Sequence, residues 1–240
     1  MIASGDTIDQ ENLLGEAEKI AIEIADFGKR LYERKYICAT EGNLSARLSD
    51  GRIMITPTDF NKGNLKPSDM VICDADSKRG DGAPVQSSEF RLHLVVYEKR
   101  PEIGAVCHAH PVYATAFSVA RVSLNKAVLP EIVSALGAIP LVAYAPPGSR
   151  ELGENLKRHV NRYDAFLLEA HGVVTIGRSC EEAFNRMEMV ERFAHILYIA
   201  EQIGELKLLT SKETLRLLEE AGRLAIKTEI ICGRRARRHK

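Results

Sequence analysis

The sequence predicts one α/β domain whose central sheet, mixed or mainly antiparallel, lies between layers of helices. Two long stretches, residues 11–35 and 179–204, repeat apolar side chains at helical spacing. Short β-branched runs such as 103–107 stand between the helices, as expected for strands of a shared sheet. The dipeptide Asp50-Gly51 separates two short alternating runs, which indicates a hairpin and therefore antiparallel pairing. Helices and strands that mix in this way are typical of a layered α/β domain.

Helices and strands are expected to alternate along the chain. From the N-terminus we expect a helix at 11–35, the hairpin around residue 50, a strand at 70–75, a helix at 87–100, a strand at 103–107, a helix at 111–121, a strand at 138–144, a helix at 150–161, two strands within 164–177, and helices at 179–204 and 212–221. Prolines and glycines set several of these limits. Pro101 follows one helix, Pro111 suits the first turn of the next, and Gly172 interrupts the run 164–177.

The composition fits a chain with a substantial hydrophobic core and a formal net charge of zero. Of the 240 residues 45% are hydrophobic, and 33 Lys and Arg balance 33 Asp and Glu. A formal net charge of zero provides no overall field to attract nucleic acid or a membrane surface. No run approaches the roughly 18 apolar residues of a membrane span. The polar first residues also lack the pattern of a signal peptide. We therefore expect neither nucleic acid nor a membrane among its partners.

Cysteine usage and charge distribution suggest a location and a domain division. The five cysteines are scattered and form no C-x-x-C pair. This pattern favours a reducing compartment, so we expect a cytoplasmic protein. We expect a flexible N-terminal segment at 1–10, one domain at 11–222, and a basic C-terminal tail at 223–240. The last eight residues, GRRARRHK, read as a solvated charge run.

Three histidines at strand ends predict a metal site. His108 and His110 lie two residues apart in an extended run, so their side chains share one face. His171 ends another apolar run, and Gly172 beside it allows close backbone approach. Any one of these histidines could equally be an ordinary polar residue in a turn. Together they would supply three imidazoles and leave one position open for substrate, the arrangement typical of catalytic zinc.

The segment Ser87-Ser88-Glu89 is a second candidate, because it is expected to begin a helix. Free backbone N–H groups and the helix dipole favour anions at such a position. Two serine hydroxyls add donors, so a phosphate could bind there. The alternative is an ordinary helix cap with a glutamate in the first turn.

Several short motifs, taken in order, resemble the class II aldolase/adducin family over roughly residues 12–205. The motifs are Gly42-Asn43-Leu44-Ser45, Ile55-Thr56-Pro57-Thr58, Ser87-Ser88-Glu89, His108-Ala109-His110 and His171-Gly172. The resemblance implies an α/β domain with a central, mainly antiparallel sheet. It also implies a homotetramer with active sites between subunits.

The resemblance further implies a role for each matched residue. His108, His110 and His171 match the zinc ligands, with one Zn²⁺ per subunit. Glu89 matches the catalytic acid/base, which can also ligate the metal when substrate is absent. The positions that match the binding site for the substrate phosphate are Gly42, Asn43, Thr58, Ser87 and Ser88.

The implied reaction is the cleavage of a short phosphorylated ketose, of the L-fuculose 1-phosphate kind, to dihydroxyacetone phosphate and a small aldehyde such as lactaldehyde. Breaking a carbon–carbon bond beside a ketone leaves an enediolate, whose charge a divalent metal can stabilise. Relatives with the same metal set suggest alternatives: a pentulose-phosphate 4-epimerase, a methylthioribulose-phosphate dehydratase and a decarboxylase of oxo-acid phosphates. An adducin-like scaffold without activity is disfavoured, because such chains lose the metal histidines.

Two positions depart from the pattern of the family. The residue after Thr58 is often glycine, whereas this chain has Asp59, whose carboxylate would have to turn away from a phosphate or be offset by Lys62. The tyrosines that donate a proton at the aldehyde end are not matched. Leu129 falls near one of those positions, and no tyrosine follows Tyr198. Glu131, or a water molecule on the metal, is therefore the expected second proton donor.

Overall fold

A seven-stranded mixed sheet forms the centre of the part of the chain that the structure describes. The structure is a computed structural model, and it describes residues 5–74, 76, 80, 82, 84–226 and 230, with backbone only for 5–11. The strand order is β3-β2-β1-β4-β7-β6-β5. Every neighbouring pair is antiparallel except β5 and β6, which run parallel. The strands are β1 (Asn43–Arg47), β2 (Ile53–Ile55), β3 (Val71–Cys73), β4 (Ala105–Ala109), β5 (Leu141–Val142), β6 (Ala165–Leu168) and β7 (Gly172–Gly177).

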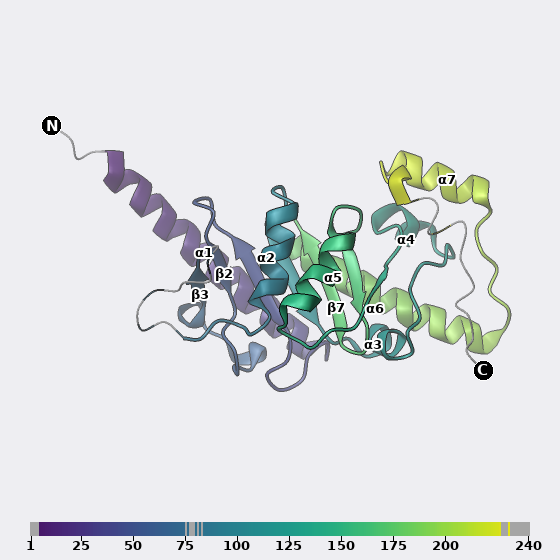
Figure 1. Cartoon of the computed structure of the whole chain (residues 1–240), viewed down its shortest axis with the longest axis horizontal. Coiled ribbons are helices and arrows are strands. Elements are labelled where there is room, and N and C mark those ends of the chain that lie inside the picture. The colour runs from purple at the N-terminus through teal and green to yellow at the C-terminus, as the bar shows by residue number, and fades with distance from the viewer. Residues whose placement is uncertain are drawn as a thin grey trace.

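Helices cover both faces of this sheet, which confirms the predicted layered α/β fold. The helices are α1 (Gly5–Glu33), α2 (Phe90–Lys99), α3 (Val112–Val119), α4 (Pro130–Ala135), α5 (Arg150–Val160), α6 (Cys180–Ile203) and α7 (Ser211–Glu220), with short 3₁₀ turns at Lys62–Asn64, Pro67–Asp69 and Leu224–Ile226. Figure 1 shows α2 and α5 side by side in front of the strands and the long helices α1 and α6 behind them.

The alternation of side chains along the central strands explains the two layers. On β4, Ala105 and Cys107 join the core under α1 and α6, whereas Val106 joins the core under α2 and α5. The same alternation on β1 buries Leu44 toward α1 and α6 and therefore turns its neighbours Asn43 and Ser45 toward α2. Polar residues at every second position of β1 thus face the helix that begins next to Glu89.

Several element limits differ from those expected. Helix α1 begins at Gly5, so residues 5–10 continue the helix into the segment expected to be flexible. Helix α2 begins at Phe90 with Glu89 as its N-cap, rather than at residue 87. The reason is that the backbone N–H of Ser87 donates to Thr56 O (3.2 Å), which keeps this segment extended beside the end of β2. Helix α4 was not expected, although Pro130 stands at its first turn.

Residues beyond the expected domain boundary at 222 still pack against the domain. Arg223 Nη2 lies 2.8 Å from Asp164 Oδ2, and Ile226 is 1% exposed in the core under α5. Most of the basic tail at 223–240 lies outside the described residues, namely 227–229 and 231–240. Among the helices of the described part, none combines the length and apolar character needed to cross a membrane.

Candidate active site

His108, His110 and His171 meet at one edge of the central sheet. Their candidate ligand atoms all lie within 4.8 Å of one another. The three ring centroids are 4.7–5.0 Å apart, and each pair of rings is tilted by more than 60°. The distance from His108 Nε2 to His110 Nε2 is 3.1 Å. The sequence-based expectation that these three histidines converge is confirmed.

The pairing of β4 with β7 brings the histidines together. His108 belongs to β4, His110 follows that strand, and His171 precedes β7, whose Val173 pairs with Ala109. The turn between β6 and β7 is tight: a Cβ on Gly172 would lie 2.4 Å from His110 Cδ2 and 2.7 Å from Ala109 O. Only glycine fits at this close approach, which explains the His171-Gly172 sequence.

Glu89 lies against the histidine cluster. Its Oε2 is 3.1 Å from His108 Nε2 and accepts a hydrogen bond of 2.8 Å from Asn43 Nδ2. Its Oε1 is 3.5 Å from His171 Nε2 and, among the described residues, has no hydrogen-bond partner. Glu89 is only 7% exposed, so this carboxylate is buried with one oxygen left uncommitted.

The charges of these groups are strongly coupled. Burial alone would raise the pKa of Glu89, but the charge and hydrogen bond of His108 lower it below its ordinary range, so Glu89 is ionised. Burial lowers the pKa of His110 to about 4, and repulsion from His108 adds to the effect. Burial likewise lowers the pKa of His171 to about 4. Burial also opposes the charged form of His108, yet Glu89 raises the pKa of this imidazole.

The donor set fits a divalent metal ion. His108 Nδ1 donates to Val173 O (2.9 Å), which leaves Nε2 free to face the cluster. Two neutral imidazole nitrogens at 3.1 Å repel each other unless a proton or a cation lies between them. Tetrahedral zinc with Zn–N bonds of about 2.0–2.1 Å would hold two such nitrogens roughly 3.3–3.4 Å apart. His108, His110 and His171 could therefore hold a metal ion with little rearrangement.

A carboxylate also stands behind His110. Glu41 Oε2 lies 3.5 Å from His110 Nδ1, and the same oxygen accepts from the backbone N–H of Cys38 (3.0 Å). Carboxylates in this position orient metal-binding histidines and fix their tautomer. No local pattern signals this contact, because strands β1 to β4 and helix α2 separate Glu41 from His110 along the chain.

The residues expected at a phosphate site come from neighbouring segments. Pro57 and Gln86 form an isolated antiparallel bridge, so the segment containing Thr58 runs beside the one containing Ser87 and Ser88. Ser88 is exposed, and the glycine of a further loop, Gly148, approaches its carbonyl so closely that a Cβ would lie 2.9 Å away. Gly42 has a positive φ of 69°, and a Cβ there would lie 2.8 Å from His108 O.

Two of the five expected phosphate residues use their side chains locally. Ser87 Oγ accepts a hydrogen bond from the backbone N–H of Glu89 (3.3 Å). Asn43 Nδ2 donates to Glu89, and Asn43 Oδ1 contacts His93 Nε2 at 2.5 Å. The side chain of Asn43 is thus committed to Glu89 rather than to a phosphate. His93 did not stand out in the sequence, although it lies one helical turn beyond Glu89.

Asp59 keeps the backbone shape that glycine would favour. Its φ is 59°, in the left-handed region, and Asp is one of the few residues other than glycine that tolerates this region. Its side chain is exposed, while the nearby Lys62 is buried at 2% exposure and donates from Nζ to Thr40 O (2.6 Å). Burial lowers the pKa of Lys62 to about 8, and the charges of Asp59 and Glu89 oppose that shift.

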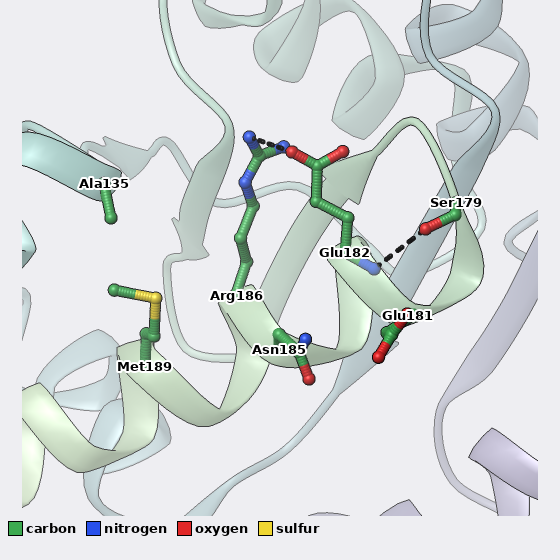
Figure 2. A pocket seen from close by; sticks show the side chains of 7 residues that line it. All are labelled: Ala135, Ser179, Glu181, Glu182, Asn185, Arg186 and Met189. Carbon is green, nitrogen blue, oxygen red and sulfur yellow. Dashed lines mark hydrogen bonds and ion pairs between the residues drawn. The ribbon is translucent and has the colours of Figure 1, made fainter. Parts of the chain in front are cut away.

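A surface cavity of about 420 Å³ lies at the start of α6 and shares no residue with the histidine cluster (Figure 2). Arg186 points toward Glu182, with 2.7 Å between Nη2 and Oε1, and it also pairs with the buried Asp164 (3.4 Å). The lining carries two carboxylates and one guanidinium, and that guanidinium already pairs with Glu182, so the charges of this cavity do not favour an anion. The lining residues are Ala135, Ser179, Glu181, Glu182, Asn185, Arg186 and Met189.

The chain is similar in sequence to two kinds of enzyme that act on phosphorylated substrates. The chain is 39% identical over 170 residues to an L-fuculose phosphate aldolase of Methanococcus maripaludis strain S2, covering 70% of this chain and 91% of that protein. It is 34% identical over 183 residues to a 3-oxo-tetronate 4-phosphate decarboxylase of Escherichia coli K12, covering 74% of this chain and 85% of that protein.

Solved structures and a family model agree with these similarities. YgbL of Escherichia coli, for which aldolase, epimerase or decarboxylase activity has been suggested, superposes with a TM-score of 0.78 at 30% identity, covering 84% of this chain and 98% of that one. An L-fuculose 1-phosphate aldolase superposes with a TM-score of 0.78 at 30% identity, covering 84% and 95%. The sequence model of the class II aldolase and adducin N-terminal domain matches residues 22–198. With that match and the histidine cluster beside Glu89, the chain belongs to the class II aldolase/adducin family.

Proposed function

We propose that this chain is a zinc-dependent aldolase that cleaves a short phosphorylated ketose, similar to L-fuculose 1-phosphate, into dihydroxyacetone phosphate and a small aldehyde such as lactaldehyde. The observation that carries the proposal is a buried carboxylate, Glu89, placed beside three convergent imidazoles with its Oε1 uncommitted. The similarity to L-fuculose phosphate aldolases at up to 39% identity supports the choice of substrate class.

The metal-binding half of the proposed site uses His108, His110 and His171 as neutral ligands. When bound, a divalent ion would polarise the ketone of the substrate and stabilise the negative charge that develops as the carbon–carbon bond breaks. Neutral imidazoles leave the full charge of such an ion available for this purpose. The low pKa values of His110 and His171, both about 4, favour the neutral form that metal binding needs, whereas His108, whose pKa Glu89 raises, would release its proton on binding.

In the proposed mechanism Glu89 moves the proton at the carbon atom released by cleavage. Its Oε2 is held by Asn43 and His108, so Oε1 is the oxygen free to give or take that proton. The backbone and hydroxyl groups around Gly42, Thr58, Ser87 and Ser88 would bind the phosphate at the other end of the substrate. Such remote contacts orient the reacting carbon, and they raise the rate when they are stronger in the transition state.

A screen of phosphorylated ketoses with zinc-loaded protein tests this proposal. We expect release of dihydroxyacetone phosphate from at least one 1-phosphorylated ketose, measured by a coupled reduction with NADH. The same protein should exchange one hydrogen of dihydroxyacetone phosphate with solvent deuterium, because proton transfer precedes addition in the reverse reaction. Absence of both cleavage and exchange across the screen would refute the aldolase assignment.

A second candidate is a decarboxylase of an oxo-acid phosphate. The observation that favours it is the 33–34% identity to several 3-oxo-tetronate 4-phosphate decarboxylases over 74–83% of this chain. Decarboxylation also breaks a carbon–carbon bond beside a ketone, and it needs no proton donor for an aldehyde. The altered aldehyde end, with Leu129 near a position often held by tyrosine, fits this reaction. Release of CO₂ without aldehyde from a 3-oxo-tetronate 4-phosphate would favour this candidate over the first.

We further propose that the chain acts in the cytoplasm as a homotetramer with active sites near subunit interfaces. Large apolar side chains are exposed on α3 and α6, which pack against each other, as expected for surfaces that another subunit covers. Cys38, Cys107 and Cys180 are free thiols in the part of the chain that the structure describes, in keeping with a reducing compartment. Light scattering at assay concentration would test the assembly, and a monomer would contradict it.

A further inference from the structure

Strand β1 and helix α2 each carry polar residues at a regular spacing, and the two spacings are nearly equal in length. On α2 and its N-cap, Glu89, His93 and Tyr97 recur every four residues, about 6.0 Å of helical rise. On β1, Asn43 and Ser45 recur every two residues, about 6.4–6.8 Å of strand rise. Because the two repeats are nearly equal, the side chains of the strand can insert between those of the helix, one after another.

The contacts follow this alternation from Glu89 into the core. Asn43 Nδ2 lies 2.8 Å from Glu89 Oε2, and Asn43 Oδ1 lies 2.5 Å from His93 Nε2. His93 Nδ1 lies 2.6 Å from Ser45 Oγ, which in turn lies 2.7 Å from the hydroxyl of Tyr97. None of the five side chains is more than 7% exposed, so water does not compete for these groups.

One arrangement of protons satisfies every link when Glu89 is ionised and His93 is neutral. The amide of Asn43 must donate to the carboxylate, so its oxygen accepts from His93 and requires the Nε2–H tautomer. The bare Nδ1 then accepts from the hydroxyl of Ser45, whose oxygen accepts from Tyr97. Burial lowers the pKa of His93 to about 3 and raises that of Tyr97, so both groups keep these protonation states at neutral pH.

We propose that His93, Ser45 and Tyr97 are positioning residues that fix the Asn43 amide against Glu89 Oε2 and so reserve Oε1 for proton transfer with the substrate. This inference deepens the proposed function above and rests on it. A rotated Asn43 amide would present its own oxygen to Glu89 and repel it. The Nε2–H of His93 prevents that rotation, because it needs an acceptor in the place where the Asn43 oxygen lies.

The first test reads the tautomer of His93 directly. In full-length, zinc-loaded protein labelled with ¹⁵N-histidine, long-range ¹H–¹⁵N correlation should show His93 as a single Nε2–H tautomer, assigned with His93→Gln. In Ser45→Ala the Nδ1 acceptor loses its donor, so the Nδ1 resonance should shift, while the Nε2–H form should persist because the Asn43 oxygen still requires that donor. A wild-type protein that carries the proton on Nδ1 would overturn the inference, whatever reaction the enzyme catalyses.

The second test separates positioning from stability by kinetics. Ser45→Ala and His93→Phe should lower kcat and deuterium exchange by roughly 10–100-fold, the usual range for groups that orient an active-site residue. KM should change less than about twofold and metal content should stay at the wild-type level, because substrate and metal contacts remain. His93→Gln offers a donor and an acceptor on one amide, so it should be at least tenfold faster than His93→Phe.

Thr175→Val is the control, since it removes a buried hydroxyl on the opposite side of the sheet that donates to Ala183 O (2.7 Å), whereas Ser45→Ala removes a buried hydroxyl with two hydrogen bonds. It should lower the melting temperature as Ser45→Ala does, with kcat unchanged. If Ser45→Ala keeps the wild-type kcat and exchange rate in folded protein, the positioning role is refuted. If the wild type shows neither cleavage nor exchange, the proposed function fails, and the tautomer measurement still decides the inference.

Discussion

Two buried carboxylates, Glu89 and Asp164, have similar exposure and very different surroundings. They are 7% and 6% exposed, and the pKa of each lies below its ordinary value despite burial, which by itself raises it. Asp164 faces three guanidinium groups: Arg100 at 3.2 Å, Arg186 at 3.4 Å and Arg223 at 2.8 Å. Glu89 faces imidazoles and an amide instead.

The difference shows how a structural carboxylate can be told from a reactive one. Arginine stays protonated at all relevant pH values, so the ion pairs of Asp164 are permanent, and both of its oxygens are engaged. The partners of Glu89 can lose a proton or bind a metal, and its Oε1 lacks a hydrogen bond among the described residues. A low pKa alone would not have separated the two sites.

The largest effect is expected from removing a histidine of the cluster beside Glu89. His110→Ala and His171→Ala should each reduce metal content from about one ion per chain to near zero and abolish activity, because two imidazoles are too few for a stable site. Far-ultraviolet circular dichroism should be unchanged. Elemental analysis after dialysis measures the outcome. Full metal occupancy in either variant would show that these histidines are not metal ligands, and Glu89 would then differ less from Asp164 than proposed.

Glu89→Gln should lower kcat by roughly 10²–10⁴-fold, the usual range for a lost general acid/base, while the metal stays bound. The amide has nearly the same shape, so the free energy of unfolding should change little. Deuterium exchange into dihydroxyacetone phosphate should fall in parallel with kcat. Exchange at the wild-type rate would show that another group moves this proton.

Asp164→Asn should have the opposite profile. Removing the buried charge takes the ion pair of Asp164 away from Arg223, while Arg100 and Arg186 keep their pairs with Glu102 and Glu182. Breaking a fully buried pair costs about 3–5 kcal/mol, which is the upper end of the expected loss for these part-buried guanidinium groups. We expect a large fall in the urea midpoint and, in the fraction that is folded at low temperature, unchanged metal content and kcat. The control is Glu33→Gln, which removes an exposed pair with Lys29 (3.8 Å) and should leave the midpoint unchanged. A normal midpoint in Asp164→Asn would contradict the structural role.

The pH dependence of stability gives the smallest effect. Because the folded pKa of Asp164 is lowered, its contribution is present above its unfolded pKa and is lost as the pH falls through the folded value. The difference in unfolding free energy between wild type and Asp164→Asn should therefore be constant near pH 7 and shrink below about pH 4. The slope cannot exceed about 1.4 kcal/mol per pH unit for one proton. A difference that grows on acidification would contradict the assignment of charge.

Local spacing allowed the metal ligands to be predicted, because His108 and His110 share a strand face wherever that strand lies. The convergence of His171 depends on the register between β4 and β7, which the structure shows and which no local pattern in the sequence specifies. The contacts of Asn43 and His93 were missed because they depend on how α2 lies across β1. A four-residue repeat of Glu89, His93 and Tyr97 opposite a two-residue repeat on β1 was the available signal.

The shortest elements, strand β5 with two residues and helix α4 with six, were the hardest to predict from the sequence. The parallel pairing of β5 with β6 involves only Leu141 and Val142 on one side, too few residues for a pattern to form. Helix α4, six residues long, was missed for the same reason. The start of α2 was misplaced because the backbone of Ser87 is hydrogen-bonded to Thr56, 31 positions earlier, and capping preferences describe only near neighbours.

The central place of β4 in the sheet has a consequence for how an ion would come and go. β4 is hydrogen-bonded to β1 on one side and to β7 on the other, so the backbone that carries His108 is closed before any ion arrives. We therefore expect this domain to fold without the metal, unlike small zinc domains that cannot fold in its absence. Chelation should therefore be reversible without denaturation, and zinc, cobalt and manganese forms could be prepared from a single apo sample and compared on an identical protein framework.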